Sequence, residues 1–200
     1  MGKVKIGARD FKYAVVKNNL CTDGIQRIPG LTEAKLEIKN EIKSFAADDG
    51  PYVQLSSGIS SATLDVKLAD MTSKARKDFF GIDLINGIEA YRKNLMPNDI
   101  AVMFKSHMDD NKGVYVALLK GKFSIPSLDA KTIDSTPDVA TDDTTGNFSP
   151  RGDDEDALVM LIGREDNPDF VYSEFEKAVF PATDDEAKLV QKVTGNNTAG

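Results

Sequence analysis

The single histidine, His107, is the residue whose type is best suited to acid–base chemistry in this chain. A serine triad needs a base that only His107 could supply, and the sequence contains no GxSxG motif. One histidine cannot build a two-histidine metal site, and the one cysteine, Cys21, excludes an internal disulfide and a cysteine-based metal cluster within one subunit. We therefore interpret His107 as a surface or turn residue.

Acidic clusters are the other groups that could bind a ligand, namely a hard cation. They lie at residues 109–110, 142–143, 153–156 and 184–186. An EF-hand loop beginning at Asp109 would need a carboxylate at its twelfth position, where the chain has Lys120. The phosphate-binding patterns GxxxxGK[ST] and GxGxxG do not occur either. The sequence thus predicts no enzymatic activity, no cofactor and no metal, with an enzyme using an acidic metal site at Asp142 and Asp143 as the alternative.

The charge is unevenly distributed along the chain. Residues 1–125 carry 19 basic and 15 acidic side chains, a net +4, whereas residues 126–200 carry 6 basic and 17 acidic ones, a net −11. A protein that holds DNA through its phosphates needs clustered lysine and arginine, and no such stripe is evident. The acids either solvate loops or form a face that repels DNA.

Length and composition favour one globular domain. The 200 residues are 40% hydrophobic and 28% charged, and no apolar run approaches the roughly 20 residues of a membrane span. The basic start is not followed by an apolar run of signal-peptide length, so we expect synthesis in a cytoplasm. We expect a single domain over residues 1–193, followed by a disordered tail at 194–200.

Short strands separated by turns dominate the pattern. Alternation is clearest where Ala62, Leu64, Val66 and Leu68 share one face. Further strands are expected at residues 11–16, 25–28, 34–43, 100–104, 114–119 and 158–162, with weaker ones at 132–134 and 146–149 around an acidic loop at 138–145. Residues 45–60, rich in glycine, serine and aspartate, predict a long projecting connection or hairpin.

Two helices are expected beside these strands. Asp70 or Thr72 can cap a short helix that ends at Gly81, and apolar residues at helical spacing over 170–180 predict a second helix that Pro181 closes. The expected fold is mainly β (α+β): a β-sandwich or partly closed barrel with a flanking short helix, a long projecting loop and a C-terminal extension over residues 152–193.

The strand at residues 114–119 is apolar on both faces. Tyr115, Ala117 and Leu119 point to one side, and their neighbours Val114 and Val116 to the other. Such a strand must be covered on each side, and in an assembly the second cover could come from a neighbouring subunit.

The segment YVALLKGKFSIPS, residues 115–127, resembles a segment of the major tail tube proteins of long-tailed, non-contractile bacteriophages of Gram-positive hosts. Three further segments resemble the same family in the same order: residues 47–52 (ADDGPY), 62–81 (ending in FFG) and 145–151 (TGNFSPR). The resemblance covers residues from about 45 to 151, and residues 82–99 and 152–156 depart from it.

This resemblance implies a structural subunit without enzymatic activity. Its copies would form six-subunit rings stacked into a hollow tube that holds the tape-measure protein and later conducts DNA into the host without binding it specifically. Its partners would be other copies, the tape-measure protein, and the tail terminator and distal tail proteins, in the virion tail and, during assembly, the host cytoplasm. The sequence is also compatible with a tube subunit of a contractile tail or secretion machine, and with a monomeric ligand-binding β-domain.

The resemblance also suggests where subunits meet. The segment at residues 45–60 would join successive rings, with Asp48, Asp49, Gly50, Pro51 and Tyr52 as inter-ring or inter-subunit contacts. Exposed edge strands would pair between subunits.

The tube lumen would be acidic. Six copies would together carry a formal charge of six times −7, or −42, and Asp142 and Asp143 are candidate lumen acids that would keep DNA from adhering.

Overall fold

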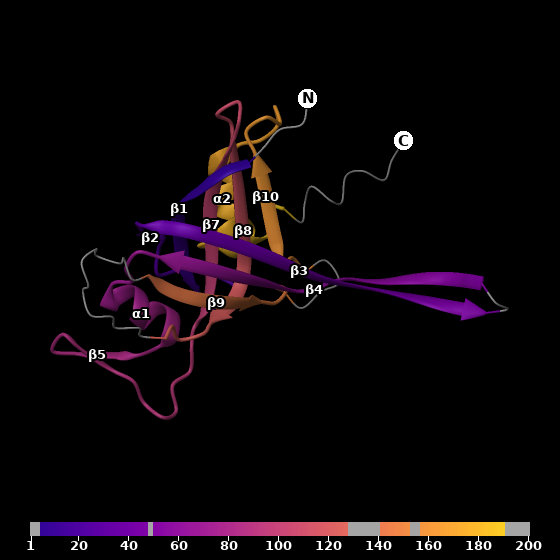
Figure 1. Ribbon diagram of the computed structural model, residues 1–200. Coiled ribbons are helices and arrows are strands. Elements are labelled where there is room, and N and C mark those ends of the chain that lie inside the picture. The colour runs from indigo at the N-terminus through magenta and orange to yellow at the C-terminus, as the bar shows by residue number, and fades with distance from the viewer. Residues whose placement is uncertain (1–4, 48–49, 128–140, 153–156, 191–200) are drawn as a thin grey trace, which may run out of the picture.

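The structure is a computed structural model that describes residues 5–47, 50–127, 141–152 and 157–190, with the backbone alone described for residues 5, 6, 41–47, 50–57 and 60 (Figure 1). The strands are β1 (Lys5–Val16), β2 (Gln26–Ile28), β3 (Leu31–Ala47), β4 (Gly50–Leu68), β5 (Asp83–Ile85), β6 (Ile88–Ala90), β7 (Asp99–Met108), β8 (Gly113–Phe123), β9 (Asp142–Phe148) and β10 (Met160–Arg164). The helices are α1 (Ser73–Phe80), α2 (Tyr172–Val179) and α3 (Asp184–Ala187). The mainly β prediction is confirmed.

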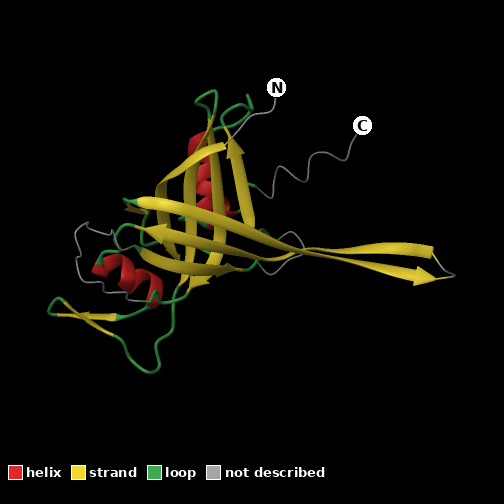
Figure 2. Cartoon of the chain, in the orientation of Figure 1, coloured by secondary structure: helices red, strands yellow, loops and turns green. Residues whose placement is uncertain are grey.

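One antiparallel sheet forms the body of the molecule, in the order β2-β1-β7-β8-β9-β4-β3. The sheet divides at β8, because residues 114–118 of that strand pair with β10 whereas Gly121 to Phe123 pair with β9. It curls so that β3 passes close to β1 (Figure 2), but no backbone pairing joins these two strands in the described part of the chain. The fold is therefore an open, sandwich-like arrangement and not a closed barrel.

Apolar side chains collect in two cores on opposite faces of β8. The inner core lies within the curl of the sheet and contains Phe11, Leu64, Phe79 of α1, Phe123 and Phe148, among others. The outer core lies between the sheet and α2 and contains Ala14, Met103, Tyr115, Val179 and Phe180, among others. The curled sheet with α1 on the inside and α2 on the outside is called the body below.

The residues of β8 alternate between these cores, as the sequence predicted. Val114, Val116 and Leu118 enter the inner core, whereas Tyr115 and Leu119 enter the outer core. The second cover, which in an assembly could have come from a neighbouring subunit, comes from α2 of the same chain. Both faces of β8 are therefore covered within one chain.

Helix α1 forms where the sequence placed it. The Thr72 side chain accepts a hydrogen bond from the Ala75 backbone N–H, and Gly81 ends the helix in the left-handed conformation. An added Cβ at Gly81 would lie 2.5 Å from the Met96 carbonyl oxygen, so glycine also lets the next segment pass close by. Thr72, and not Asp70, is the N-cap.

Several local expectations need correction. Of the two forms expected for residues 45–60, a loop and a projecting hairpin, the structure has the hairpin, because residues 50–60 belong to β4 and pair with β3. Residues 142–145, expected in an acidic loop, belong to β9 because they pair with the apolar strand β4. β5, β6 and α3 were not predicted, and β10 begins at Met160 rather than at residue 158. The expected strand at 132–134 and the tail at 194–200 lie outside the described residues.

A glycine lets β8 and β9 approach each other closely. Gly121 pairs with Phe148 of β9, and an added Cβ would lie 2.5 Å from the Phe148 ring and 2.6 Å from the Asn147 carbonyl oxygen. We expect Gly121→Ala to lower the free energy of unfolding by about 1–3 kcal/mol through overpacking. Urea denaturation measures this loss as a lower midpoint at unchanged slope. The matched substitution Lys122→Ala, at the exposed neighbouring position, should change stability by less than about 0.5 kcal/mol, and equal losses in the two variants would contradict the packing account.

Candidate assembly interface

The outer half of the β3–β4 hairpin projects from the body (Figure 1). β4 pairs with β9 only as far as Ala62, whereas β3 and β4 stay paired out to Ala47 and Gly50. Residues 39–47 and 50–61, called the ribbon below, therefore extend beyond the part of β4 that β9 covers. At about 3.3 Å per residue the ribbon reaches roughly 30 Å past the edge of the body.

The predicted contact residues lie at the far end of this ribbon. Gly50 closes the ladder opposite Ala47, and Pro51 lies opposite Ala46, with Tyr52 directly after it. Asp48 and Asp49 lie outside the described residues. Gly50, Pro51 and Tyr52 therefore lie at the far end of the ribbon, as far as the structure describes it. Their role as contacts remains a prediction.

The outward surface of β3, β4 and β9 is a polar face made of side chains in register. It consists of Glu33, Lys35, Glu37, Thr63, Asp65, Lys67, Asp143, Thr145 and Asn147. Opposite charges alternate across the strands: Lys67 lies between Glu33 and Asp143, and its Nζ is 2.8 Å from Glu33 Oε2. Thr145 Oγ1 donates a 2.7 Å hydrogen bond to Asp65 Oδ1. Two lysines against four acids leave this face mildly negative.

The two candidate lumen acids have different environments. Asp143 is exposed on the polar face. Asp142 instead accepts hydrogen bonds from Arg76 Nη2 at both carboxylate oxygens, at 2.7 and 2.8 Å, and from the Met71 backbone N–H at 2.8 Å. Its side chain is only 14% exposed, so Asp142 ties β9 to the start of α1.

The same alternation separates the two carboxylates. Neighbouring residues of a strand point to opposite faces, so Asp142 and Asp143 do not form a joint cation site. The described residues contain no group of three or more histidine, cysteine, aspartate or glutamate side chains that could hold a metal ion.

His107 has no partner for acid–base chemistry in the described part of the chain. Its two ring nitrogens are buried and make no hydrogen bond there. The interpretation of His107 as a surface or turn residue is wrong, because it lies within strand β7, opposite Gly113 of β8. No described helix is both long and apolar enough to cross a membrane.

Polar contacts that the sequence did not reveal fasten the C-terminal part to the sheet. Lys105 Nζ donates to Tyr115 Oη and to Glu165 Oε1, both at 2.8 Å, and Tyr115 Oη donates to the same glutamate oxygen at 2.6 Å. The Gly113 backbone N–H donates to Glu165 Oε2 at 2.6 Å. The hydrogen bonds from Lys105, Tyr115 and Gly113 lower the pKa of Glu165 from 4.5 to about 2.

A second group of the same composition holds α2. Lys12 Nζ donates to Tyr172 Oη and Glu176 Oε1, both at 2.9 Å, and Tyr172 Oη donates to Glu176 at 2.7 Å. Burial opposes ionisation of Glu176, but the hydrogen bonds from Lys12 and Tyr172 outweigh it and lower the pKa of that carboxyl group. The rings of Tyr115 and Tyr172 lie 4.9 Å apart, so the two groups form one continuous seam between sheet and helix.

Arg151 fixes the other end of α2. Its guanidinium is buried and donates to the backbone carbonyl oxygens of Ala178 and Val179, at 2.5 and 2.7 Å. Burial lowers the pKa of Arg151, and the carbonyl end of a helix is a favourable place for its positive charge. No local signal predicts this contact, because the partners lie 27 and 28 residues further along the chain.

β10 has an open edge. It pairs with β8 on one side, and the described residues provide no strand on its other side. Its Ile162 side chain is 52% exposed. Such an edge is available for strand addition by a second chain.

The chain matches no family model and no curated protein. Among solved structures, the sheath–tube complex of an extracellular contractile injection system (PVC) in its extended state, solved by cryo-electron microscopy, shares 15% sequence identity. The match covers 77% of this chain and 88% of that chain, with a TM-score of 0.38. A likeness of this size carries no inference about what this chain does.

The Glu165 contacts predict a pH-dependent contribution to stability. Because the folded-state pKa of Glu165, about 2, is below its ordinary 4.5, its carboxylate stabilises the fold above about pH 5, and this contribution is lost as the pH falls toward 2. Glu165→Gln should therefore reduce the unfolding free energy near neutral pH and have no effect near pH 2. Since the side chain is 35% exposed and screened by solvent, we expect only about 1 kcal/mol.

Urea denaturation of both proteins from neutral to acidic pH measures this difference. Glu174→Gln, which changes an exposed glutamate of α2, is the control. A difference between wild type and Glu165→Gln that stayed constant across the pH range would contradict the assigned contacts.

Proposed function

We propose that this protein is the tail tube subunit of a long-tailed, non-contractile bacteriophage. Its copies would form six-subunit rings stacked around a channel that holds the tape-measure protein and then conducts DNA, and the protein would have no enzymatic activity. The observation that carries this proposal is the ribbon. The resemblance of residues 47–52 and 115–127 to segments of tail tube proteins supports it.

A ribbon of this kind is poorly suited to a protein that acts alone. The outer edges of its two strands are surfaces on which a strand of another chain can add. Two-stranded hairpins are at best marginally stable in water unless they pack against something else. A reach of roughly 30 Å is enough to bring the ribbon onto a neighbouring subunit, which supports a role in joining successive rings through Gly50, Pro51 and Tyr52.

The body supports the same role for a different reason. Both faces of β8 are covered within the chain. The Lys12 group holds α2 in place, and the Lys105 group fastens the segment before it. A subunit that folds completely before it polymerises can accumulate as a stable precursor. Its assembly surfaces then lie at the periphery, in the ribbon and in the open edge of β10, where strand addition could contribute to ring closure.

The polar face is our candidate for the channel wall. Its alternating charges, with a mild excess of acid, would not bind the phosphates of DNA. Its polar side chains would also make no apolar contact with the molecules that pass. Asp143 is exposed on this face and is retained as a lumen acid, whereas Asp142 is assigned to the structural pair with Arg76. Other expected partners are the tape-measure, tail terminator and distal tail proteins, in the virion tail and, during assembly, in the host cytoplasm.

Trimming the ribbon tests the proposal. We expect the purified full-length protein to form tubes of uniform width in negative-stain electron microscopy. A variant in which Asn-Gly replaces residues 42–56 should form monomers or single rings only. Its Tm should change by less than about 2 °C, because no residue of the inner or outer core is removed.

Two results would contradict this prediction. Tubes of the trimmed variant that match the wild type would show that the ribbon does not join rings. Full-length protein that remains monomeric at all concentrations would overturn the proposed function itself.

The channel assignment predicts a charge effect on ejection. Asp143→Lys should slow genome ejection from virions with intact tails, because it adds a site on the wall that attracts phosphate. Asp143→Asn removes charge without reversing it and should change ejection much less. Ejection at the wild-type rate in the lysine variant would show that Asp143 does not face the channel.

A further inference from the structure

The turn of the β5–β6 hairpin holds a chemically reactive pair of residues. Asn86 and Gly87 form this two-residue turn, with φ values of 52° and 79°. It is the one position in the 200-residue sequence where glycine follows asparagine. The amide carbon of an asparagine side chain can be attacked by the backbone nitrogen of the next residue. Glycine hinders this attack least, because it has no side chain.

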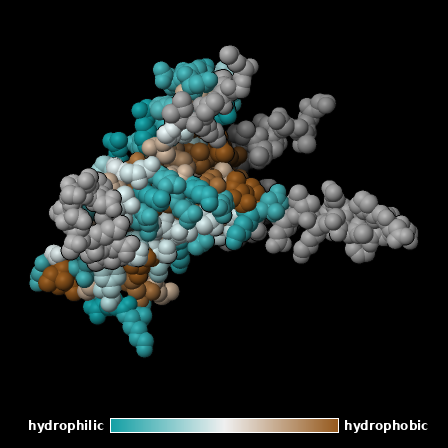
Figure 3. Space-filling view, in the orientation of Figure 1, coloured by the Kyte–Doolittle hydropathy of each residue, from teal (hydrophilic) through white to brown (hydrophobic). Residues whose placement is uncertain are grey.

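Both reacting groups are open to solvent. Asn86 and Gly87 are exposed, and a Cβ added to Gly87 would meet no atom within 4 Å. Within the described residues, neither the Asn86 side chain nor the Gly87 N–H makes a hydrogen bond. Figure 3 shows exposed apolar residues where Figure 1 places β5, and Ile85 and Ile88 on either side of the turn are 52% and 68% exposed. Water and base can therefore reach the turn.

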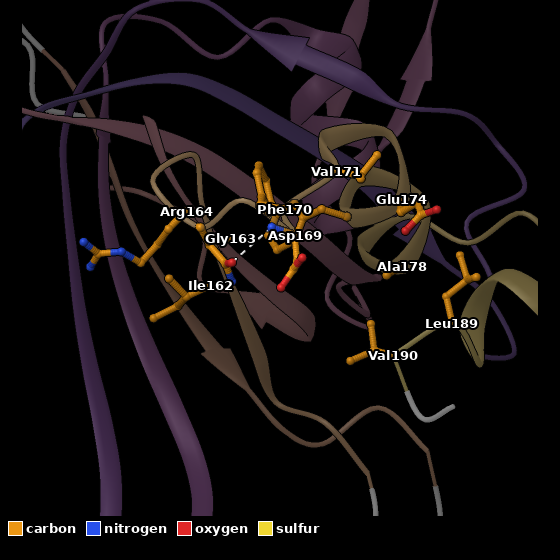
Figure 4. Close-up of a pocket in the computed structure, with 12 residues that line it drawn as sticks. Ile162, Gly163, Arg164, Asp169, Phe170, Val171, Glu174, Ala178, Leu189 and Val190 are labelled. Atoms are coloured by element: carbon orange, nitrogen blue, oxygen red, sulfur yellow. Dashed lines mark hydrogen bonds between the residues drawn. The ribbon is translucent and has the colours of Figure 1, made fainter. Parts of the chain in front are cut away.

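The nitrogen that follows other asparagines is less available. Asn167 lines the pocket shown in Figure 4 and precedes Pro168, which has no N–H. At three further asparagines, the N–H of the next residue already donates a hydrogen bond. These are Asn19, where Leu20 donates to the Lys17 carbonyl oxygen at 3.0 Å, Asn94, where Leu95 donates to the Arg92 carbonyl oxygen at 3.1 Å, and Asn111, where Lys112 donates to Asp110 Oδ1 at 3.2 Å. Asn86 differs from these asparagines in having a free attacking nitrogen beside it.

The hairpin can open while the body stays folded. β5 and β6 pair only with each other in the described chain, through three residue pairs. No residue from 83 to 90 belongs to the inner or outer core, and the Arg92–Asp83 ion pair at the base of the hairpin is solvent-exposed. A hairpin of this size is marginally stable by itself. Local opening, which Gly87 N needs in order to reach Asn86 Cγ, is therefore much less costly than global unfolding.

We propose that Asn86 is a self-modification site, converted to aspartate and isoaspartate in the folded protein with water as the co-reactant. Gly87 N gives its proton to a solvent base and bonds to Asn86 Cγ. A five-membered imide ring closes as the Cγ–Nδ2 bond breaks and Nδ2 leaves as ammonia. Water then opens the imide: cleavage of the Cγ–N bond gives aspartate, and cleavage of the backbone C–N bond gives isoaspartate. No oxidation or reduction takes place, and the proposal does not depend on the proposed function.

The two products affect the hairpin differently. Asp-Gly suits the same turn as Asn-Gly, so the aspartate form can restore the pair between Ile85 and Ile88. In the isoaspartate form the backbone runs through Cβ and Cγ and the turn gains one atom, so this pair is lost. Residues 83–90 contain two acidic side chains and no basic one, so either product adds a negative charge that no residue of the hairpin neutralises. The exposed hairpin would thus change slowly and irreversibly in charge and shape.

Peptide mapping of the full-length protein tests the proposal. Trypsin places Asn86 in residues 78–92 and Asn111 in residues 106–112, each as the sole asparagine of its peptide. Asn111 is the internal control, because it is exposed and has a similar φ of 62° but is followed by Lys112. After incubation of the folded protein at mildly alkaline pH, mass spectrometry should find NH2 replaced by OH at Asn86 at least about tenfold more often than at Asn111. Fragmentation that separates aspartate from isoaspartate should find both products.

Two results of this experiment would overturn the proposal. The first is an intact Asn86 in the folded protein over a period in which the urea-unfolded chain is modified, since it would show that the turn stays closed. The second is equal modification of Asn86 and Asn111, since it would show that the free nitrogen of Gly87 does not select the site.

The variant Lys112→Gly separates the effect of sequence from that of structure. It gives the chain a second Asn-Gly pair at an exposed position, where the attacking N–H donates to Asp110. We expect Asn111 in this variant to be modified about fivefold more slowly than Asn86, because the hydrogen bond must first break. Circular dichroism establishes that the variant folds. Equal rates at the two pairs would count against the proposal, because sequence alone would then set the reactivity.

Discussion

Burial of β8 on both of its faces is the constraint on which the rest of this structure depends. Val114, Val116 and Leu118 need an apolar cover on one side, and Tyr115 and Leu119 need one on the other. The curled sheet with α1 supplies the first cover, and α2 supplies the second. The polar contacts of Glu176 and Arg151 hold α2 in place, and those of Glu165 fasten the segment between β10 and α2 to β7 and β8.

This constraint separates folding from assembly. The C-terminal segment is an integral part of the body, because β10 pairs with β8 and α2 completes the outer core. The surfaces that we propose for association are peripheral, namely the ribbon and the edge of β10. The ribbon can be shortened without removing a residue of either core, so the proposed assembly can be tested apart from folding.

Much of the fold follows from local sequence signals. Thr72 and Gly81 define α1, and the alternation from Ala62 to Leu68 defines the inner half of β4. The turn at Asn86 and Gly87 is a strong hairpin signal that should have revealed β5 and β6. The ribbon was harder to recognise as strand, because glycine, proline and serine are turn-forming residues and pairing with β3 overrides that tendency.

The site residues were predictable only in part. The sequence pattern predicts the same role for Asp142 and Asp143. The two acids differ only because β9 is a strand, in which neighbouring side chains point to opposite faces. The contacts from Arg76 to Asp142 and from Arg151 to α2 join residues far apart in the chain, and periodicity carries no information about them. The isoleucines on either side of Asn86-Gly87 are visible in the sequence, but their exposure is a product of packing.

Helical reconstruction of the polymerised wild-type protein by cryo-electron microscopy would measure directly what the ribbon contacts. A tail tube subunit should give a hollow tube of stacked rings in which residues 39–61 lie against a subunit of the adjoining ring. A tube in which the ribbon touches no other subunit, or a protein that forms no tube under any condition, would contradict that role.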